Sequence, residues 1–187
     1  MGHALKLTYA DYALTPEGTR YELLEGELHM TPAPNTLHQR ISRAVFDLIE
    51  DWVKKKSLGE VFYSPIDVLL SRENVVQPDL LFISTGRRGI ISERGVEGPP
   101  DLVVEILSPS TRNRDVDLKH RLYAQYGVRE YWIVDPQGQT VEVAALKEQN
   151  LSTLNVHPEG ASVLSPTFPG LSFDPKLIFC SYGTVLR

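Results

Sequence analysis

The chain has 187 residues, 42% of them hydrophobic and 23% charged, and its formal net charge is −5 at pH 7. This length favours one domain over residues 1–187. The only cysteine, Cys180, excludes an internal disulfide framework and a cysteine-rich zinc site, and a reducing cytoplasm is the expected location. No apolar run approaches the roughly 20 residues of a membrane span, and the acidic balance argues against a broad basic surface for nucleic acid.

The first part of the chain predicts a short helix, a hairpin and one long helix. Thr8 can cap a helix over residues 9–14, and strands over 21–24 and 28–31 flank a glycine turn at Gly26. Asn35 is a good N-cap for a helix that reaches about Lys56. Helical spacing predicts one buried stripe on this helix, made of Leu37, Ile41, Val45, Leu48, Ile49 and Trp52.

The rest of the chain alternates strand and helix signals. Strands are predicted over 60–64, 66–70, 80–83, 102–107, 130–134, 140–145, 151–156 and 161–164. Residues 84–100 are predicted to form a long loop. A helix over about 115–126, capped by Ser110 or Thr111, stops at Gly127, and Asp174 opens a short terminal helix. The pattern predicts an α/β (α+β) fold with a mixed sheet and a few helices.

Two apolar segments of strand length each hold one carboxylate. Asp79 stands directly before the segment 80–83, and Glu105 lies inside the segment 102–107. An ionised carboxylate in an apolar interior is costly unless a cation or hydrogen bonds compensate it. Asp79 could instead bond its own turn after Pro78, and Glu105 could pair with an arginine. We interpret both acids as compensated by a divalent cation.

Magnesium suits this pair of acids, because it is typically held by one or two carboxylates together with water and substrate phosphate. Asp79 and Glu105 could supply the carboxylates, and the backbone carbonyl of Ile106 could add a third oxygen. Such an ion could activate a water and stabilise the charge that builds on a phosphodiester during attack.

Lys119 is the candidate cation beside such a metal. It lies on the helix predicted after the Glu105 strand, and it could orient the water or neutralise developing charge. Asp115 stands four residues earlier, so an ordinary surface ion pair is the alternative. Tyr123, one turn further along the same face, could pack over the site or belong to the core.

Several motifs recur in a combination that a known family shares. They are Pro78-Asp79, the stretch from Pro100 to Thr111 with Glu105-Ile106-Leu107 inside it, the stretch from Tyr126 to Asp135, Tyr21-Glu22-Leu23, Gly26-Glu27-Leu28 and His38. These motifs resemble the Uma family of restriction endonuclease-like proteins, within the PD-(D/E)xK nuclease superfamily. The resemblance implies a restriction-endonuclease-like core, a mixed β-sheet flanked by helices with an N-terminal hairpin, and Mg²⁺ or Mn²⁺ held by Asp79 and Glu105.

One position departs from the superfamily pattern. Leu107 stands where the lysine of the motif is expected, and the resemblance implies that Lys119 on the following helix replaces that lysine. Glu22 or Glu27 resembles the additional acid that many superfamily sites take from an N-terminal element, and the choice between them stays open. Supporting roles are possible for His38, Gln77 and Tyr123.

Two functions follow from these residues. The first is a divalent-metal endonuclease that acts on DNA, expected by analogy with restriction enzymes to be a homodimer. The second is a catalytically inactive nuclease-fold module that binds a protein or nucleic-acid partner. The acidic composition and Leu107 favour the module, whereas both buried acids favour the enzyme.

Overall fold

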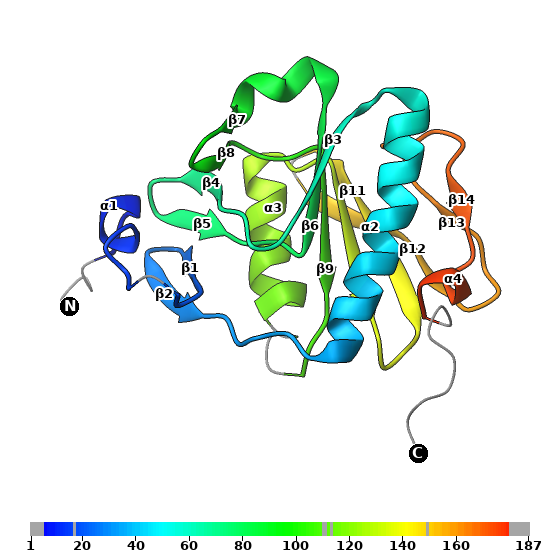
Figure 1. Cartoon of the computed structure of the whole chain (residues 1–187), viewed down its shortest axis with the longest axis horizontal. Coiled ribbons are helices and arrows are strands. Elements are labelled where there is room, and N and C mark those ends of the chain that lie inside the picture. Colours follow the sequence, from blue (N-terminus) through cyan, green and yellow to red (C-terminus); the bar gives the residue numbers. More distant parts are fainter. Residues whose placement is uncertain (1–5, 17, 110–111, 113, 149, 180–187) are drawn as a thin grey trace.

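The computed structural model describes residues 6–16, 18–109, 112, 114–148 and 150–179. Within these residues the chain folds into a mixed α/β structure with two six-stranded sheets and one two-stranded sheet (Figure 1). Ser110 and Thr111, predicted as helix caps, and Cys180 lie outside the described residues. None of the helices in the described part of the chain is long and apolar enough to cross a membrane.

One six-stranded sheet has longer strands than the other, and we call it the larger sheet. Its strand order is β12-β11-β10-β9-β6-β3. Its strands are β3 (Gly59–Tyr63), β6 (Leu80–Ser84), β9 (Leu102–Ile106), β10 (Glu130–Asp135), β11 (Thr140–Lys147) and β12 (Asn150–Pro158). The pair β9 and β10 is parallel, and the other neighbouring pairs are antiparallel. A parallel pair needs a crossover connection. Here the crossover contains η2 (Arg114–Lys119) and α3 (His120–Tyr126), so it carries Lys119 over one face of the sheet.

The smaller sheet lies beside the larger one, at the left of Figure 1, and has the order β2-β1-β5-β4-β8-β7. Its strands are β1 (Tyr21–Leu24), β2 (Glu27–Met30), β4 (Val68–Ser71), β5 (Asn74–Val76), β7 (Ile91–Ser92) and β8 (Gly95–Glu97). The helix predicted over residues 9–14 is α1 (Tyr9–Tyr12). The single loop predicted over 84–100 is wrong, because this segment forms η1 (Thr85–Ile90), β7 and β8. Pairing of β8 with the distant β4 stabilises it, and no local pattern shows that contact.

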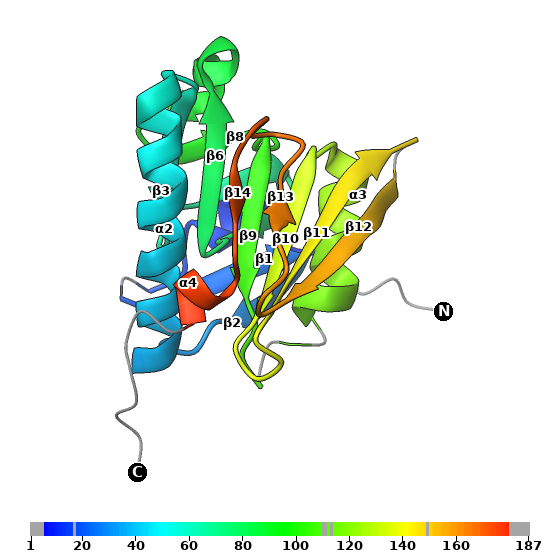
Figure 2. The same ribbon diagram turned by 90° about the vertical axis from the view of Figure 1, so that its right-hand side faces the viewer.

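Helix α2 (Thr36–Lys56) covers one face of the larger sheet, and α3 covers the opposite face (Figure 2). Asn35 caps α2 as predicted, since its side chain accepts a hydrogen bond from the His38 amide at 2.8 Å. The buried side chains of α2 are Ile41, Val45, Ile49 and Val53. Leu37 is 43% exposed, so its place in the predicted stripe is wrong. The first turn of α2 borders a cavity instead of the core.

Strand β9 presents alternate side chains to the two faces of the larger sheet, as a strand must. Leu102, Val104 and Ile106 pack in the core beneath α2, whereas Val103 and Leu107 pack in the core beneath α3. Glu105 is in phase with Val103, so its carboxylate points toward the α3 side.

The crossover helix differs from the predicted regular helix over 115–126. Its first part, η2, is a π-helix, and the α-helical part begins only at His120. Gly127 ends it in the left-handed conformation, with φ of 86°. After β12, the described part of the chain ends with β13 (Val163–Leu164), β14 (Ser172–Phe173) and α4 (Lys176–Phe179), which pack against the α2 side of the sheet.

Candidate functional site

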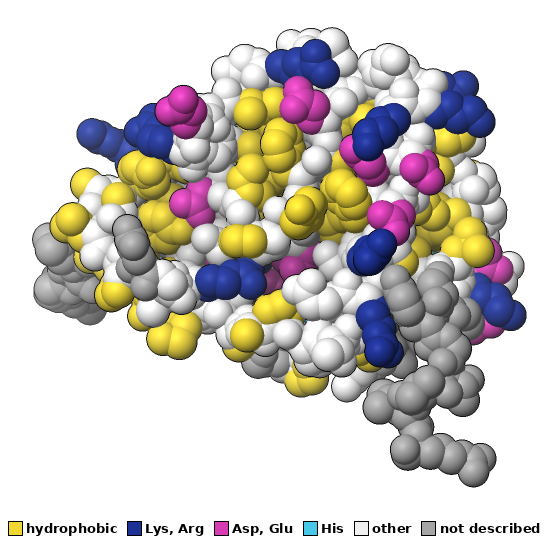
Figure 3. Space-filling view, in the orientation of Figure 1, with side chains coloured by type: hydrophobic (Ala, Val, Ile, Leu, Met, Phe, Trp, Pro, Cys, Tyr) yellow, Lys and Arg dark blue, Asp and Glu magenta, His cyan; other side chains and the backbone are white. Residues whose placement is uncertain are grey.

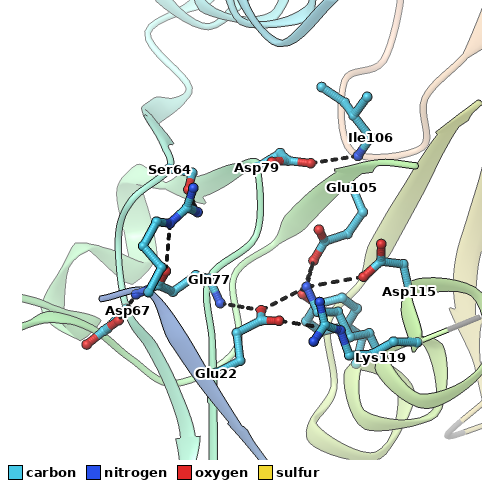
Figure 4. Close-up of polar contacts among 12 residues, drawn as sticks. Glu22, Ser64, Asp67, Gln77, Asp79, Glu105, Ile106, Asp115 and Lys119 are labelled. Atoms are coloured by element: carbon cyan, nitrogen blue, oxygen red, sulfur yellow. Dashed lines mark hydrogen bonds and ion pairs between the residues drawn. The ribbon is translucent and has the colours of Figure 1, made fainter. Parts of the chain in front are cut away.

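A group of buried charged side chains lies between the smaller sheet, β9 and η2. The ammonium Nζ of Lys119 is 2.8 Å from Glu22 Oε1, 2.8 Å from Glu105 Oε1 and 3.4 Å from Asp115 Oδ1 (Figure 4). Lys119 is only 3% exposed, and its three partners are buried as well. We call Glu22, Glu105, Asp115 and Lys119 the buried charge cluster.

Three separate elements bring this cluster together. Glu22 lies on β1 in phase with Leu24, which packs in the α3-side core, so the carboxylate faces that core. Its Oε1 also accepts a hydrogen bond from the Gln77 backbone amide at 2.8 Å. Glu105 extends from β9, and Lys119 is the last residue of η2, so their side chains meet beside Glu22.

The environment of Glu105 disfavours its charged form. Burial raises the pKa of the Glu105 carboxyl well above its ordinary value, the Lys119 ammonium opposes this, and the nearby carboxylates of Asp115, Asp79 and Glu22 raise the pKa further. The Tyr123 hydroxyl donates to Glu105 Oε1 at 2.7 Å. The cluster therefore holds more negative charge than its own cation balances.

Lys119 responds in the opposite sense. Burial by itself lowers the pKa of the ammonium, but the charges of Glu105, Glu22 and Asp115 outweigh burial and raise the pKa well above its usual value. Lys119 is therefore a permanent cation at neutral pH.

Asp79 stands at the same site, directly before β6. Its Oδ2 accepts a hydrogen bond from the backbone N–H of Ile106 at 2.8 Å, and His38 Nε2 lies 3.1 Å from the same oxygen. Burial lowers the pKa of His38, but the hydrogen bond and charge of Asp79 outweigh it, so the pKa is raised overall. The Asp79 carboxylate is thus held toward β9 from two sides.

Asp79, His38 and the buried charge cluster line one cavity of about 310 Å³. Its charged or ionisable lining residues are Arg20, Glu22, His38, Asp79, Glu105, Arg114, Asp115 and Lys119. The cavity thus brings four carboxyl groups together with three basic side chains and His38. The Oε2 of Glu22 is buried and accepts no hydrogen bond in the described structure, and it forms a loose ion pair with Arg114 Nε at 3.8 Å. Carboxyl groups gathered in one cavity are suited to bind a cation.

The comparison with protein families decides the affiliation of the chain. The family model described as "Uma2: Putative restriction endonuclease" matches residues 8–176. The chain belongs to the Uma2 family. With that family comes a restriction-endonuclease-like fold.

Solved structures agree on the fold of this Uma2 chain. A crystal structure of "a putative nuclease belonging to DUF820" from Anabaena variabilis matches with a TM-score of 0.77 and 24% sequence identity. The match covers 92% of this chain and 97% of the other. No curated protein matched the chain.

The Uma2 structure brings most of the predicted site residues together. Asp79, Glu105, Lys119 and Glu22 all line the cavity, as do Ile106, the predicted third metal ligand, and the supporting residues His38 and Gln77. The third supporting residue, Tyr123, is not among the lining residues, but its hydroxyl donates to Glu105. Glu27 is exposed on β2 and is not among the lining residues, so the structure favours Glu22 as the N-terminal acid. The alternative of a surface ion pair for Lys119 is wrong, because the pair with Asp115 is buried.

Three charged residues of the cavity were not predicted from the sequence. The sequence identifies Asp115 only as a possible surface partner of Lys119, and it does not identify Arg20 or Arg114 as site residues. The spacing of Asp115 and Lys119 was a usable signal, since residues four apart share a helix face. Asp79 and Glu105 are recognisable because each is a charged residue in or beside an apolar segment. Neither arginine stands in such a segment, so this criterion does not identify them.

Proposed function

We propose that this Uma2 chain is a divalent-metal-dependent endonuclease that hydrolyses DNA phosphodiester bonds. The observation that carries the proposal is the buried charge cluster, which shares one cavity with Asp79. Buried ionic groups are rarely the cheapest way to stabilise a fold, and perturbed carboxyl groups in a cleft are typical of functional sites. DNA as the substrate enters the proposal from the family resemblance, the homodimer from the analogy with restriction enzymes, and the single domain from the length of the chain.

The residues present fit a divalent cation. Asp79 lies directly before β6 and Glu105 lies on the neighbouring antiparallel strand β9, and the carbonyl of Ile106 follows Glu105 directly. In the described part of the chain, no three His, Cys, Asp or Glu side chains are placed to hold a metal by themselves. Two carboxylates can hold Mg²⁺ or Mn²⁺ when backbone, water and substrate oxygens complete the coordination. When bound, such an ion lowers the pKa of a water and stabilises negative charge on phosphate.

The protein's own groups then have distinct tasks. Lys119 stays protonated, so it acts as a fixed cation that stabilises charge on the phosphodiester and cannot serve as a general base. Glu22 and Asp115 fix the position of its ammonium. Tyr123 and His38 restrain the carboxylates of Glu105 and Asp79. In this proposal the β1–β2 hairpin belongs to the active centre because it carries Glu22.

The direct test is calorimetric titration of Mn²⁺ into the wild type, Asp79→Asn and Glu105→Gln, followed by a DNA cleavage assay. We expect Mn²⁺ binding to be lost in both variants. Lys119→Met should keep metal binding and lose about 10²- to 10³-fold in cleavage rate, as when one stabilising donor is removed from an active site. Glu27→Gln is the matched control, because this exposed acid on β2 should leave both binding and cleavage unchanged.

The second candidate function, an inactive nuclease-fold module, rests on a specific observation. Leu107 stands where the lysine of the motif is expected, and Lys119 is already paired with three carboxylates. A folded wild type that binds no Mn²⁺, either alone or with DNA present to supply a phosphate ligand, would favour this module.

A further inference from the structure

Two arginines reach the cavity beside the buried charge cluster. Arg114 begins η2, and its Nε is buried and has no hydrogen-bond partner in the described structure. The guanidinium forms an ion pair with Glu22, in which Nε lies 3.8 Å from Oε2, beyond hydrogen-bonding distance. Arg20 precedes β1 and is held by Ser64 Oγ at 2.6 Å and Gln77 Oε1 at 3.4 Å. One guanidinium group is therefore positioned by neutral partners, and the other has an unused donor.

The acids of the cavity define what the two arginines can bind. Glu22, Glu105 and Asp115 already hold Lys119, and a divalent cation at Asp79 and Glu105 would engage those two acids as well. The guanidinium groups of Arg20 and Arg114 would then be available to an anion. A phosphodiester group of a nucleic-acid strand is an anion that guanidinium groups bind well.

Because the acidic groups are buried, only some forms of a nucleic-acid strand can reach them. Glu22, Glu105 and Asp115 are buried, and the cavity volume of about 310 Å³ is at the low end of the roughly 300–1,000 Å³ of small-ligand pockets. Phosphates of an intact duplex lie on a stiff cylinder, since the persistence length of DNA is about 50 nm. A phosphate can enter a recessed site more easily when its strand is unpaired and bends.

The rim of the cavity suits an unpaired nucleotide as well. The lining includes exposed or half-exposed apolar side chains from separate segments of the chain, which are Pro32, Ala33, Pro34, Leu37, Pro109 and Pro136. Unstacked bases need apolar or aromatic surface to replace their stacking partners. In Figure 3, cationic and acidic side chains alternate over the face shown, and no continuous basic band crosses it to follow the backbone of a duplex.

We propose that the site binds an unpaired DNA strand, with one phosphodiester held between Arg20 and Arg114 and the adjoining nucleotide against the proline-rich rim. This inference rests on the proposed function, because it assigns the substrate form of the same site. Arg20 and Arg114 are then the phosphate-binding residues, and single-stranded DNA, a frayed end or a flap is preferred over a blunt duplex.

The test measures binding and cleavage separately. Fluorescence anisotropy with Ca²⁺ present compares one labelled single-stranded DNA oligonucleotide with its blunt duplex, for the wild type, Arg20→Gln and Arg114→Gln. We expect the wild type to bind the single strand at least about ten-fold more tightly, as charge-assisted contacts allow. Each variant should lose about ten-fold in affinity and lower the slope of log affinity against log salt by about 0.7, the value for one phosphate contact to a single strand.

Two further variants control for folding and for general charge. Arg114→Lys keeps the charge and should keep the salt slope, whereas Arg43→Gln removes an exposed arginine of α2 outside the cavity and should behave as the wild type. Cleavage of the same two DNA forms in Mn²⁺ is measured in parallel.

The outcomes separate this inference from the proposed function. Arginine-dependent preference for the single strand without cleavage would support the inference and refute the endonuclease. Cleavage with equal or stronger binding of the duplex would support the endonuclease and overturn the inference. Binding that is lost equally in Arg43→Gln, or no binding of either form, would also overturn the inference.

Discussion

Among single residues, Lys119 is the buried cation that three buried carboxylates share. Replacing it by Met would leave the carboxylates of Glu22, Glu105 and Asp115 buried together without their shared cation. Removing one partner of a buried ion pair costs about 3–5 kcal/mol, and we expect Lys119→Met to lose this much stability in urea unfolding with chelator present. The double variant Lys119→Met/Asp115→Asn should regain part of the loss, because it removes one of the stranded charges. A Lys119→Met protein as stable as the wild type would contradict this account of the cluster.

The sequence identifies some residues of the site and not others for a physical reason. Asp79 and Glu105 stand out locally because a carboxylate is costly in an apolar strand, and both line the cavity. The choice between Glu22 and Glu27 depends on which face of β1 meets α3, and that is a long-range contact. Arg20 and Arg114 are positioned by groups far away in the chain, so no local pattern distinguishes them from surface arginines.

At the scale of elements, Asp101 links the start of β9 to residues of neighbouring segments. It is buried and accepts hydrogen bonds from the Ser84 amide at 2.8 Å and from Arg87 at 3.1 Å, and Arg129 lies 2.9 Å away. Burial raises its pKa, but the bonds to Ser84 and Arg87 outweigh burial, so the pKa is lowered. Because the folded state favours the ionised form, this stability is present above the ordinary pKa and is lost as the pH falls through the lowered value.

The corresponding variant is Asp101→Asn, which removes this charge at some distance from the candidate site. We expect a loss of about 2 kcal/mol at pH 7, the size of a hydrogen bond to a charged group. The difference from the wild type should shrink as the pH falls below about 4, where Asp101 of the unfolded chain becomes protonated. Urea unfolding across this pH range measures both effects. A difference that does not depend on pH would show that the charge of Asp101 contributes nothing.

Elements with a strong local signal are predicted best. Helix α2 has an Asn cap and a periodic apolar stripe, and the sequence locates it correctly except that Leu37 is exposed and Val53 is buried. Strand β9 is recognisable as an unbroken apolar run. The π-helix η2, in which Asp115 and Lys119 are buried, is not predicted, because a π turn is rare and has no distinct signal in the local sequence.

For the whole molecule, metal binding and folding should be linked, because only the folded chain brings Asp79 and Glu105 together to bind a divalent cation. At a Mn²⁺ concentration 100 times the Kd, linkage gives about 2.7 kcal/mol, or roughly 5–10 °C in Tm for a chain of this size. We expect this shift in the wild type and in the control Glu27→Gln. Glu105→Gln should show no such shift in thermal unfolding. An equal shift in Glu105→Gln would place the ion elsewhere on the molecule.

The residues of the cavity come from distant parts of the chain, from Glu22 on β1 to Lys119 at the end of η2. No short fragment contains both acids of the metal pair together with the lysine and the β1 acid. During synthesis, a growing chain therefore lacks a complete site until the crossover after β9 has been made and has docked on the sheet. If the chain cuts DNA, its activity cannot begin before that crossover has docked.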